Sequence, residues 1–269
     1  MRRAFILFMA TFLLVAWTTD ADARRRRRRR RKAPTTEKVN KRAAVAIAAL
    51  TGKYKWGLGP MKVVKLLTAD LKKDYIRRIR KARSSPRKQD RLRKELRRKI
   101  RKAKKSLFKF TGKRSGWDSS IIDDQFKHNN QESLVVFLEK EQQRFFFFHN
   151  GKLYKQFIAF NADHKNYKGL TFPQFLGKLI KLFGAGKPEF KKDLAGQSRL
   201  HHVQWIGAKK VHMWAVDKST IYGNFCVVLF QSVMKEKVLE GRKLSGSGRR
   251  RGYDPLIDSV TKPRKETDY

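Results

Sequence analysis

The sequence predicts an α+β protein, in which an antiparallel β-sheet with helices on one face is preceded by a basic helical hairpin. Apolar residues three or four apart run from Met61 to Lys105 and again after Thr171, as in amphipathic helices. Short aromatic and β-branched runs separated by turn residues fill much of the chain from Ser106 to Phe230. Because hairpins and short connections join these runs, antiparallel pairing is favoured over a parallel sheet.

The helical part opens with a short apolar helix over 42–52 that is closed by Gly52. Pro60 suits the first turn of the next helix. The sequence Ser84-Ser85-Pro86 then interrupts the helical pattern, with Ser85 as N-cap and Pro86 at the first helical position. Two antiparallel helices joined by a short turn are therefore expected. Their apolar stripes are Val64, Leu67, Leu71, Tyr75, Ile79 and Ala82, followed by Leu92, Leu96, Ile100, Ala103 and Leu107.

Seven strands are expected after the hairpin. They cover 106–110, 133–139, 144–150, 152–161, 200–206, 211–216 and 224–230. Asn150-Gly151 accepts the positive φ angles of a type I′ turn, which predicts a hairpin between the third and fourth strands. The run Phe145 to Phe148 places Phe on both sides of one strand, so that strand should be covered on both faces. Helices are expected from Thr171 to Gly184 and from Ser232 to Lys243.

The chain accordingly divides into five segments. They are a signal peptide over 1–23, a disordered Arg-rich segment over 24–42, a helical region with the basic hairpin over 43–107, an α+β domain over 108–244 and a flexible tail over 245–269.

Two stretches carry a resemblance to a known family: "WGLGPMKVVKLL", where a helix follows a Gly turn, and "GKLYKQFIAF", followed by a helix ending "FGAGKP". In these the chain resembles uncharacterised exported proteins of the Gram-negative bacterial envelope, with repeats like the β-lactamase-inhibitor-protein fold. The resemblance covers about Trp56 to Ser232. It implies that a helix and a run of antiparallel strands occur twice, with the basic hairpin inserted in the first copy, and it implies no activity.

The N-terminus combines a basic start, a short apolar run from Ala4 to Trp17 and small residues at Ala21 and Ala23, as in a cleaved secretory signal. The run is shorter than the roughly 20 apolar residues of a membrane span. Arg24 to Lys32 then places nine positive charges after the run, which the positive-inside rule would retain in the cytoplasm. Export to the periplasm or the medium is the expectation, and an uncleaved anchor holding the body on the cytoplasmic side is the alternative.

Charge is the strongest functional signal, because the chain carries a formal net charge of +43. Residues 72–114 contain twenty-two Lys and Arg and only three acids. Such a surface favours an anionic partner, and an anionic component of the envelope is expected: the lipid head groups of a membrane surface, lipopolysaccharide or an acidic polysaccharide. Nucleic acid is the alternative partner. The candidate binding residues are an N-terminal arm and a helical face: Arg24, Arg25, Arg26, Arg27, Arg28, Arg29, Arg30, Arg31, and Arg77, Arg78, Arg87, Arg91, Arg97, Arg98, Arg101 and Lys102.

No catalytic residue, metal site or cofactor is expected from the sequence. "GAGKP" resembles a phosphate-binding loop, but Pro188 stands where Ser or Thr is needed. Cys226 lies in an apolar strand and is expected to be buried. His201 and His202 are adjacent in a strand, so they should face opposite ways. If Ala208-Lys209 forms the hairpin turn, His212 is expected opposite Trp205. No small-molecule substrate is indicated.

The aromatic residues leave one further alternative, an apolar-ligand-binding module. Trp117, Trp205, Trp214 and the Phe cluster could line a concave pocket for a lipid or peptide. Core packing explains the same residues with fewer assumptions, since large aromatic side chains dominate protein cores.

Overall fold

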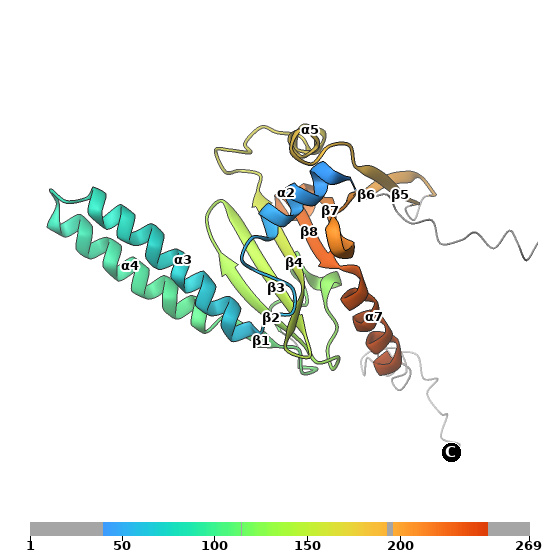
Figure 1. Cartoon of the computed structure of the whole chain (residues 1–269), viewed down its shortest axis with the longest axis horizontal. Coiled ribbons are helices and arrows are strands. Elements are labelled where there is room, and N and C mark those ends of the chain that lie inside the picture. The colour runs from blue at the N-terminus through green and yellow to red at the C-terminus, as the bar shows by residue number, and fades with distance from the viewer. Residues whose placement is uncertain (1–39, 114, 193–195, 247–269) are drawn as a thin grey trace, which may run out of the picture. The chain divides into compact units, whose positions relative to one another are not determined.

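Eight antiparallel strands form one sheet in the order β1-β2-β3-β4-β8-β7-β6-β5 (Figure 1). The computed structural model describes residues 40–113, 115–192 and 196–246. The expected signal peptide, Arg24 to Arg31 and nearly all of the C-terminal tail lie outside these residues. The strands are β1 (Leu107–Lys109), β2 (Glu132–Leu138), β3 (Gln142–His149), β4 (Lys152–Asn161), β5 (Lys187–Lys192), β6 (Ser198–Ile206), β7 (Val211–Lys218) and β8 (Asn224–Gln231).

The sheet consists of two four-stranded meanders that meet at one strand pair. β1 to β4 follow one another across one half, and β5 to β8 follow one another across the other half. β4 and β8 join the halves, with Phe157 opposite Val228 and Ala159 opposite Cys226. The α+β class and the antiparallel sheet are confirmed.

The longer helices are α2 (Lys41–Thr51), α3 (Pro60–Lys81), α4 (Pro86–Lys104), α5 (Phe172–Phe183) and α7 (Ser232–Gly246). The described residues also form the short helix α6 (Ser219–Tyr222) and two 3-10 turns, η1 (Asp123–Gln125) and η2 (Ala208–Lys210). α2 begins at Lys41 because the Asn40 side chain accepts the backbone N–H of Arg42 at 2.9 Å. α2 therefore begins one residue before residue 42, where the Arg-rich segment was expected to end.

α4 and α5 begin at the residues that proline and capping residues predict. Pro86 opens α4 with Ser85 as its N-cap, although the Ser85 side chain makes no capping hydrogen bond. Thr171 precedes α5 in a capping box, in which the Thr171 backbone N–H donates to Gln174 Oε1 at 2.8 Å.

Both faces of the sheet are covered. α2 and α5 pack on one face over β6 to β8, and α3 packs on the same face through Val63, Val64 and Leu67. The other face is covered by residues 117–126 and by α7, whose Val238 lies among Phe145, Phe147 and neighbouring core residues. The expectation of helices on one face thus holds for α2, α3 and α5, whereas α7 lies on the opposite face.

The four consecutive phenylalanines of β3 confirm the prediction of a strand covered on both sides. Phe145 and Phe147 point into one apolar cluster and Phe146 and Phe148 into another, all with at most 1% of their surface exposed. The adjoining turn is also as expected, since Asn150 and Gly151 have φ angles of 49° and 70°.

One strand was not expected. β5 contains three lysines and Pro188, and nearly all of it is exposed at the edge of the sheet. Charges and proline are typical of edge strands, where they discourage pairing with other chains. The same residues remove the apolar alternation by which a strand is recognised, so the sequence pattern predicts no strand here.

Candidate polyanion-binding surface

α3 and α4 form the expected basic hairpin and lie side by side (Figure 1). Beyond the part of α3 that packs on the sheet, the hairpin has its own small core. This core contains Leu71, Tyr75, Ala82 and Leu92, with Phe137 of β2 packed against it. α4 is thus held by a narrow apolar stripe, and the rest of its circumference is free to carry charge.

The charge on α4 is almost entirely of one sign: the helix contains eleven Lys and Arg and two acids. Arg87, Arg91, Arg98 and Lys102 are spaced four, seven and four residues apart, so they share one side of the helix. Arg97 and Arg101 form the adjacent row. At 1.5 Å per residue, the row from Arg87 to Lys102 extends over about 22 Å.

The three acids that follow Asp70 in the hairpin form ion pairs with cations outside these two rows. Asp74 pairs with Arg77 at 2.8 Å and with Arg78 at 3.9 Å. On α4, Asp90 pairs with Arg93 at 2.9 Å and Glu95 with Lys99 at 3.9 Å. Among the described residues, no ion pair involves the six cations of the two rows.

The structure therefore divides the eight hairpin residues predicted to bind a polyanion into two groups. All eight are exposed. Arg77 and Arg78 are paired with Asp74, and Arg78 also lies over the Tyr75 ring at 4.6 Å. The remaining six share the outer side of α4, and none of them forms an ion pair with a described carboxylate. We call these six residues the α4 cation rows: Arg87, Arg91, Arg97, Arg98, Arg101 and Lys102.

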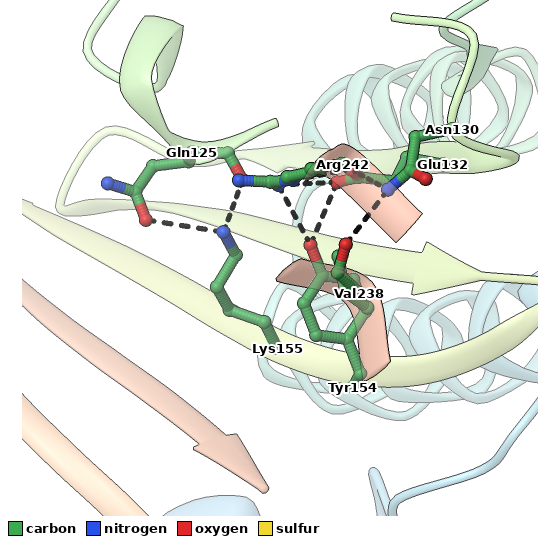
Figure 2. Close-up of polar contacts among 7 residues, drawn as sticks. All are labelled: Gln125, Asn130, Glu132, Tyr154, Lys155, Val238 and Arg242. Carbon is green, nitrogen blue, oxygen red and sulfur yellow. Dashed lines mark hydrogen bonds and ion pairs between the residues drawn. The ribbon is translucent and has the colours of Figure 1, made fainter. Parts of the chain in front are cut away.

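A buried polar network fixes α7 to the second face of the sheet (Figure 2). The Glu132 carboxylate accepts hydrogen bonds from Arg242, from the Tyr154 hydroxyl at 2.9 Å and from the Asn130 amide at 2.9 Å. Burial disfavours ionisation of Glu132, but hydrogen bonding and ion pairing with Arg242 outweigh it and lower its pKa. Because this buried ion pair joins α7 to β2, it fixes the position of α7 on the sheet.

Lys155 lies beside this network with its ammonium group 4.3 Å from the Phe147 ring centre. It donates to Gln125, whose backbone carbonyl also accepts a hydrogen bond from Arg242 at 2.9 Å. Burial and the positive charge of Arg242 lower the pKa of Lys155 to about 7.

His128 is held by hydrogen bonds at both of its ring nitrogens. His128 Nε2 lies 2.6 Å from Asp118 Oδ1, and its Nδ1 accepts the backbone N–H of Gly112 at 3.1 Å. That second bond places the proton on Nε2 and occupies the lone pair that a general base would need. The hydrogen bond from His128 lowers the pKa of Asp118 to about 2. Across the described ranges, no group of three His, Cys, Asp or Glu side chains could hold a metal ion.

Two expectations about the β6 and β7 histidines were wrong. His201 and His202 do not face opposite ways, because their Nδ1 atoms lie 2.7 Å apart. The register between β5 and β6 shifts at Glu189/Phe190, and His201 is the unpaired residue of this bulge. His212 lies opposite Ile206, not Trp205.

The tryptophans expected either in the core or in an apolar pocket, Trp117, Trp205 and Trp214, pack into the apolar clusters. Trp205 is 2% exposed and belongs to the main apolar cluster, and Trp117 and Trp214 pack against the cluster on the other face. Cys226 is fully buried, and burial raises the pKa of its thiol far above the ordinary range.

No family model and no curated protein matches the chain. A cysteine-rich secretory protein from Staphylococcus aureus subsp. aureus Mu50 is a structural neighbour at a TM-score of 0.22 and 8% identity, over 39% of this chain and 36% of that one. None of the helices within the described ranges has the length and apolarity needed to cross a bilayer.

Proposed function

We propose that the protein binds an anionic surface or polymer through the α4 cation rows and has no catalytic role. The observation that carries the proposal is the alignment of six exposed cations on one side of one helix, none of which forms an ion pair with a described carboxylate. Like charges four residues apart on a helix repel one another by a few tenths of a kcal/mol per pair. A polyanion relieves this repulsion and releases counterions, so binding is expected to be strong at low salt and weak at high salt.

The arrangement favours a partner recognised by charge over one recognised by its bases. Single-stranded nucleic acid binding relies on exposed aromatic side chains on which bases stack. Of the three aromatic residues in and next to the hairpin, Tyr75 and Phe110 are at most 2% exposed, and Phe108 is half-buried against an apolar cluster of the sheet. Binding of phosphate-rich lipid head groups or acidic polysaccharides requires only rows of positive charge. Clustered Lys and Arg each contribute about 1 kcal/mol of binding free energy near an anionic membrane.

Arg24 to Arg31 would add a second contact in the same chain. Linking two binding segments makes the second binding step intramolecular and strengthens the whole attachment. This arm lies outside the described residues, and its role is inferred from its eight consecutive charges.

We further propose that the protein is exported and acts at the bacterial envelope. The proposal is supported by the basic start, the short apolar run and the small residues Ala21 and Ala23. N-terminal sequencing of protein from separated cell fractions tests it. A chain that starts at Arg24 outside the cytoplasm is expected. An intact Met1 in the membrane fraction, with the body protected from external protease, would place the protein on the cytoplasmic side and favour nucleic acid.

Binding is tested with vesicles of phosphatidylcholine containing about 30% phosphatidylglycerol, which carry a phosphate-based surface charge. The wild-type chain should co-sediment with these vesicles at low salt, and the triple variant R97E/R98E/R101E should bind at least tenfold more weakly. The matched control reverses three exposed lysines outside the hairpin, Lys165, Lys168 and Lys178, and should retain most of the binding.

Parallel titrations with heparin and with double-stranded DNA distinguish the partner classes. Tighter binding to vesicles or heparin than to DNA at the same salt concentration agrees with the proposal. Equal loss of binding in the triple variant and in the control would show that only the total charge matters, and would contradict a role for the α4 cation rows.

A further inference from the structure

A cleft of about 990 Å³ lies at one end of the sheet, away from the α4 cation rows. The start of β4, the start of β7 and the end of β8 meet there, because these neighbouring strands are antiparallel. α2 supplies one wall and the first turns of α7 supply another. The volume is in the range of sites for small ligands, roughly 300 to 1,000 Å³.

The floor and walls of the cleft are largely apolar. Ala44, Ile47 and Ala48 line it from α2, with Val211 of β7 and Met234 of α7. The Ile47 side chain also packs against Gly207, where an added Cβ would lie only 3.2 Å from Ile47 Cδ1. This close approach holds α2 against the η2 turn, so the apolar wall is fixed.

The loop between α2 and α3 forms the third side, and hydrogen bonds hold it in place. The Gly57 backbone N–H donates to the Leu153 carbonyl at 2.9 Å, and the Leu153 N–H donates back to Leu58 at 2.9 Å. The side chain of Gln156 also donates to the carbonyl of Tyr54 at 3.1 Å. Trp56, which lines the cleft, is therefore carried on an ordered segment.

Four lysines from four different elements surround this apolar interior: Lys55, Lys152, Lys209 and Lys237. No acidic residue lines the cleft. Among the described residues, none of the four forms an ion pair with a carboxylate. Four such cations around one hollow create a positive potential that no carboxylate among the described lining residues compensates.

Two further features point to a ligand. Lys209 has φ and ψ of 55° and 35°, a left-handed conformation that few residues other than glycine adopt. Backbone strain of this kind is retained at ligand-binding sites when it places a side chain usefully. His149 also lines the cleft, and burial lowers its pKa, which favours the neutral imidazole as a hydrogen-bonding group.

We infer that this cleft binds a small amphiphile with one anionic head group, such as an alkyl phosphate. The apolar wall of α2 and Met234 would contact the chain of the ligand, and the lysines would contact its phosphate. This site is independent of the α4 cation rows, so either may fail without the other.

The full chain is titrated with octyl phosphate by isothermal titration calorimetry in 150 mM NaCl, below the micelle concentration. Octyl phosphate should bind at one site, at least tenfold more tightly than 1-octanol and than inorganic phosphate. Equally tight binding of octanol would overturn the role of the lysines. Equally tight binding of inorganic phosphate would overturn the role of the apolar wall.

Variants locate the site. K152Q/K237Q removes two cleft charges, and A48W fills the cleft from an exposed position of α2 without changing charge. Each should weaken octyl phosphate binding at least tenfold, whereas R97E/R98E/R101E should leave it within twofold. Wild-type affinity in both cleft variants, or loss of affinity only in the hairpin variant, would overturn the assignment.

Discussion

Arg242 and Glu132 are 110 residues apart in the chain and form a two-point ion pair. Arg242 Nε lies 2.8 Å from Glu132 Oε1, and Nη2 lies 2.7 Å from Oε2 (Figure 2). The Glu132 side chain is completely buried. This pair ties the last described helix to the second strand of the sheet, and it thereby fixes the α7 wall of the cleft.

Removal of one partner should therefore be costly. Arg242→Met leaves Glu132 charged in a buried site, and the free energy of unfolding should fall by about 3 to 5 kcal/mol. The double variant Glu132→Gln/Arg242→Met should recover part of this loss, because no unpaired charge remains. Chemical denaturation measures each value. Lys243→Met, at the exposed neighbouring position, is the control and should change stability by less than about 0.5 kcal/mol. A loss in Arg242→Met no larger than in this control would contradict the role of the pair.

Stability should increase with pH above neutrality because of Lys155. Burial and Arg242 hold its pKa at about 7 in the folded protein, below the ordinary value of 10.5. Between pH 7 and 10 the unfolded chain therefore binds a proton that the folded protein does not, and raising the pH favours folding.

The measurement is the free energy of unfolding at several pH values from 7.5 to 9.5. Lys155→Met should reduce its slope by up to about 1.4 kcal/mol per pH unit, the value for one proton. In both proteins Lys235, whose pKa burial lowers to about 8, adds to the slope, whereas Cys226, whose pKa burial raises, reduces it. Lys140→Met, an exposed control, should keep the wild-type slope. Identical slopes in Lys155→Met and wild type would show that Lys155 keeps its proton.

The Cys226 thiol should be inert in the folded protein. It is fully buried, and burial raises its pKa, so little thiolate forms. Reaction with a disulfide reagent should be at least about a hundredfold slower in native buffer than in denaturant. A cysteine introduced at the exposed Ser119 should react immediately and serves as the control. Fast reaction of Cys226 in native buffer would indicate that the β4–β8 junction opens readily.

The hairpin should become more ordered when an anionic polymer binds. α4 is held by a narrow apolar stripe and carries like charges on its outer side, so at low salt its helical hydrogen bonds should open more often than those of β4. Heparin should slow amide hydrogen exchange in Pro86–Lys104 and raise helical circular dichroism. Exchange in β4 should be unaffected and is the internal reference. No change in α4 would count against it as the contact surface.

Features that depend on local sequence could be predicted well. Ser85-Pro86 begins a helix and Asn150-Gly151 forms a turn because the backbone preferences of these residues are intrinsic. The Phe run of β3 identified a strand covered on both faces because no amphipathic alternation remained. The exposure of the α4 cation rows followed from their spacing around the apolar stripe.

Features that depend on distant partners could not be predicted. Nothing near Glu132 indicates that Arg242 will neutralise it, and a bulge such as that at His201 depends on the partner strand. The cleft lysines come from four separate segments between Lys55 and Lys237. In a chain with sixty-six Lys and Arg, their convergence has no local signature.

The salt dependence of heparin binding by the full chain and by R97E/R98E/R101E tests the α4 cation rows most directly. Counterion release makes the logarithm of the binding constant fall linearly with the logarithm of the salt concentration, by somewhat less than about one unit of slope per contact. If the α4 cation rows contact the polymer, the variant should bind more weakly and its slope should be lower by about two to three units. An unchanged slope would show that these arginines do not contact the polymer, and it would contradict the assignment of the α4 cation rows.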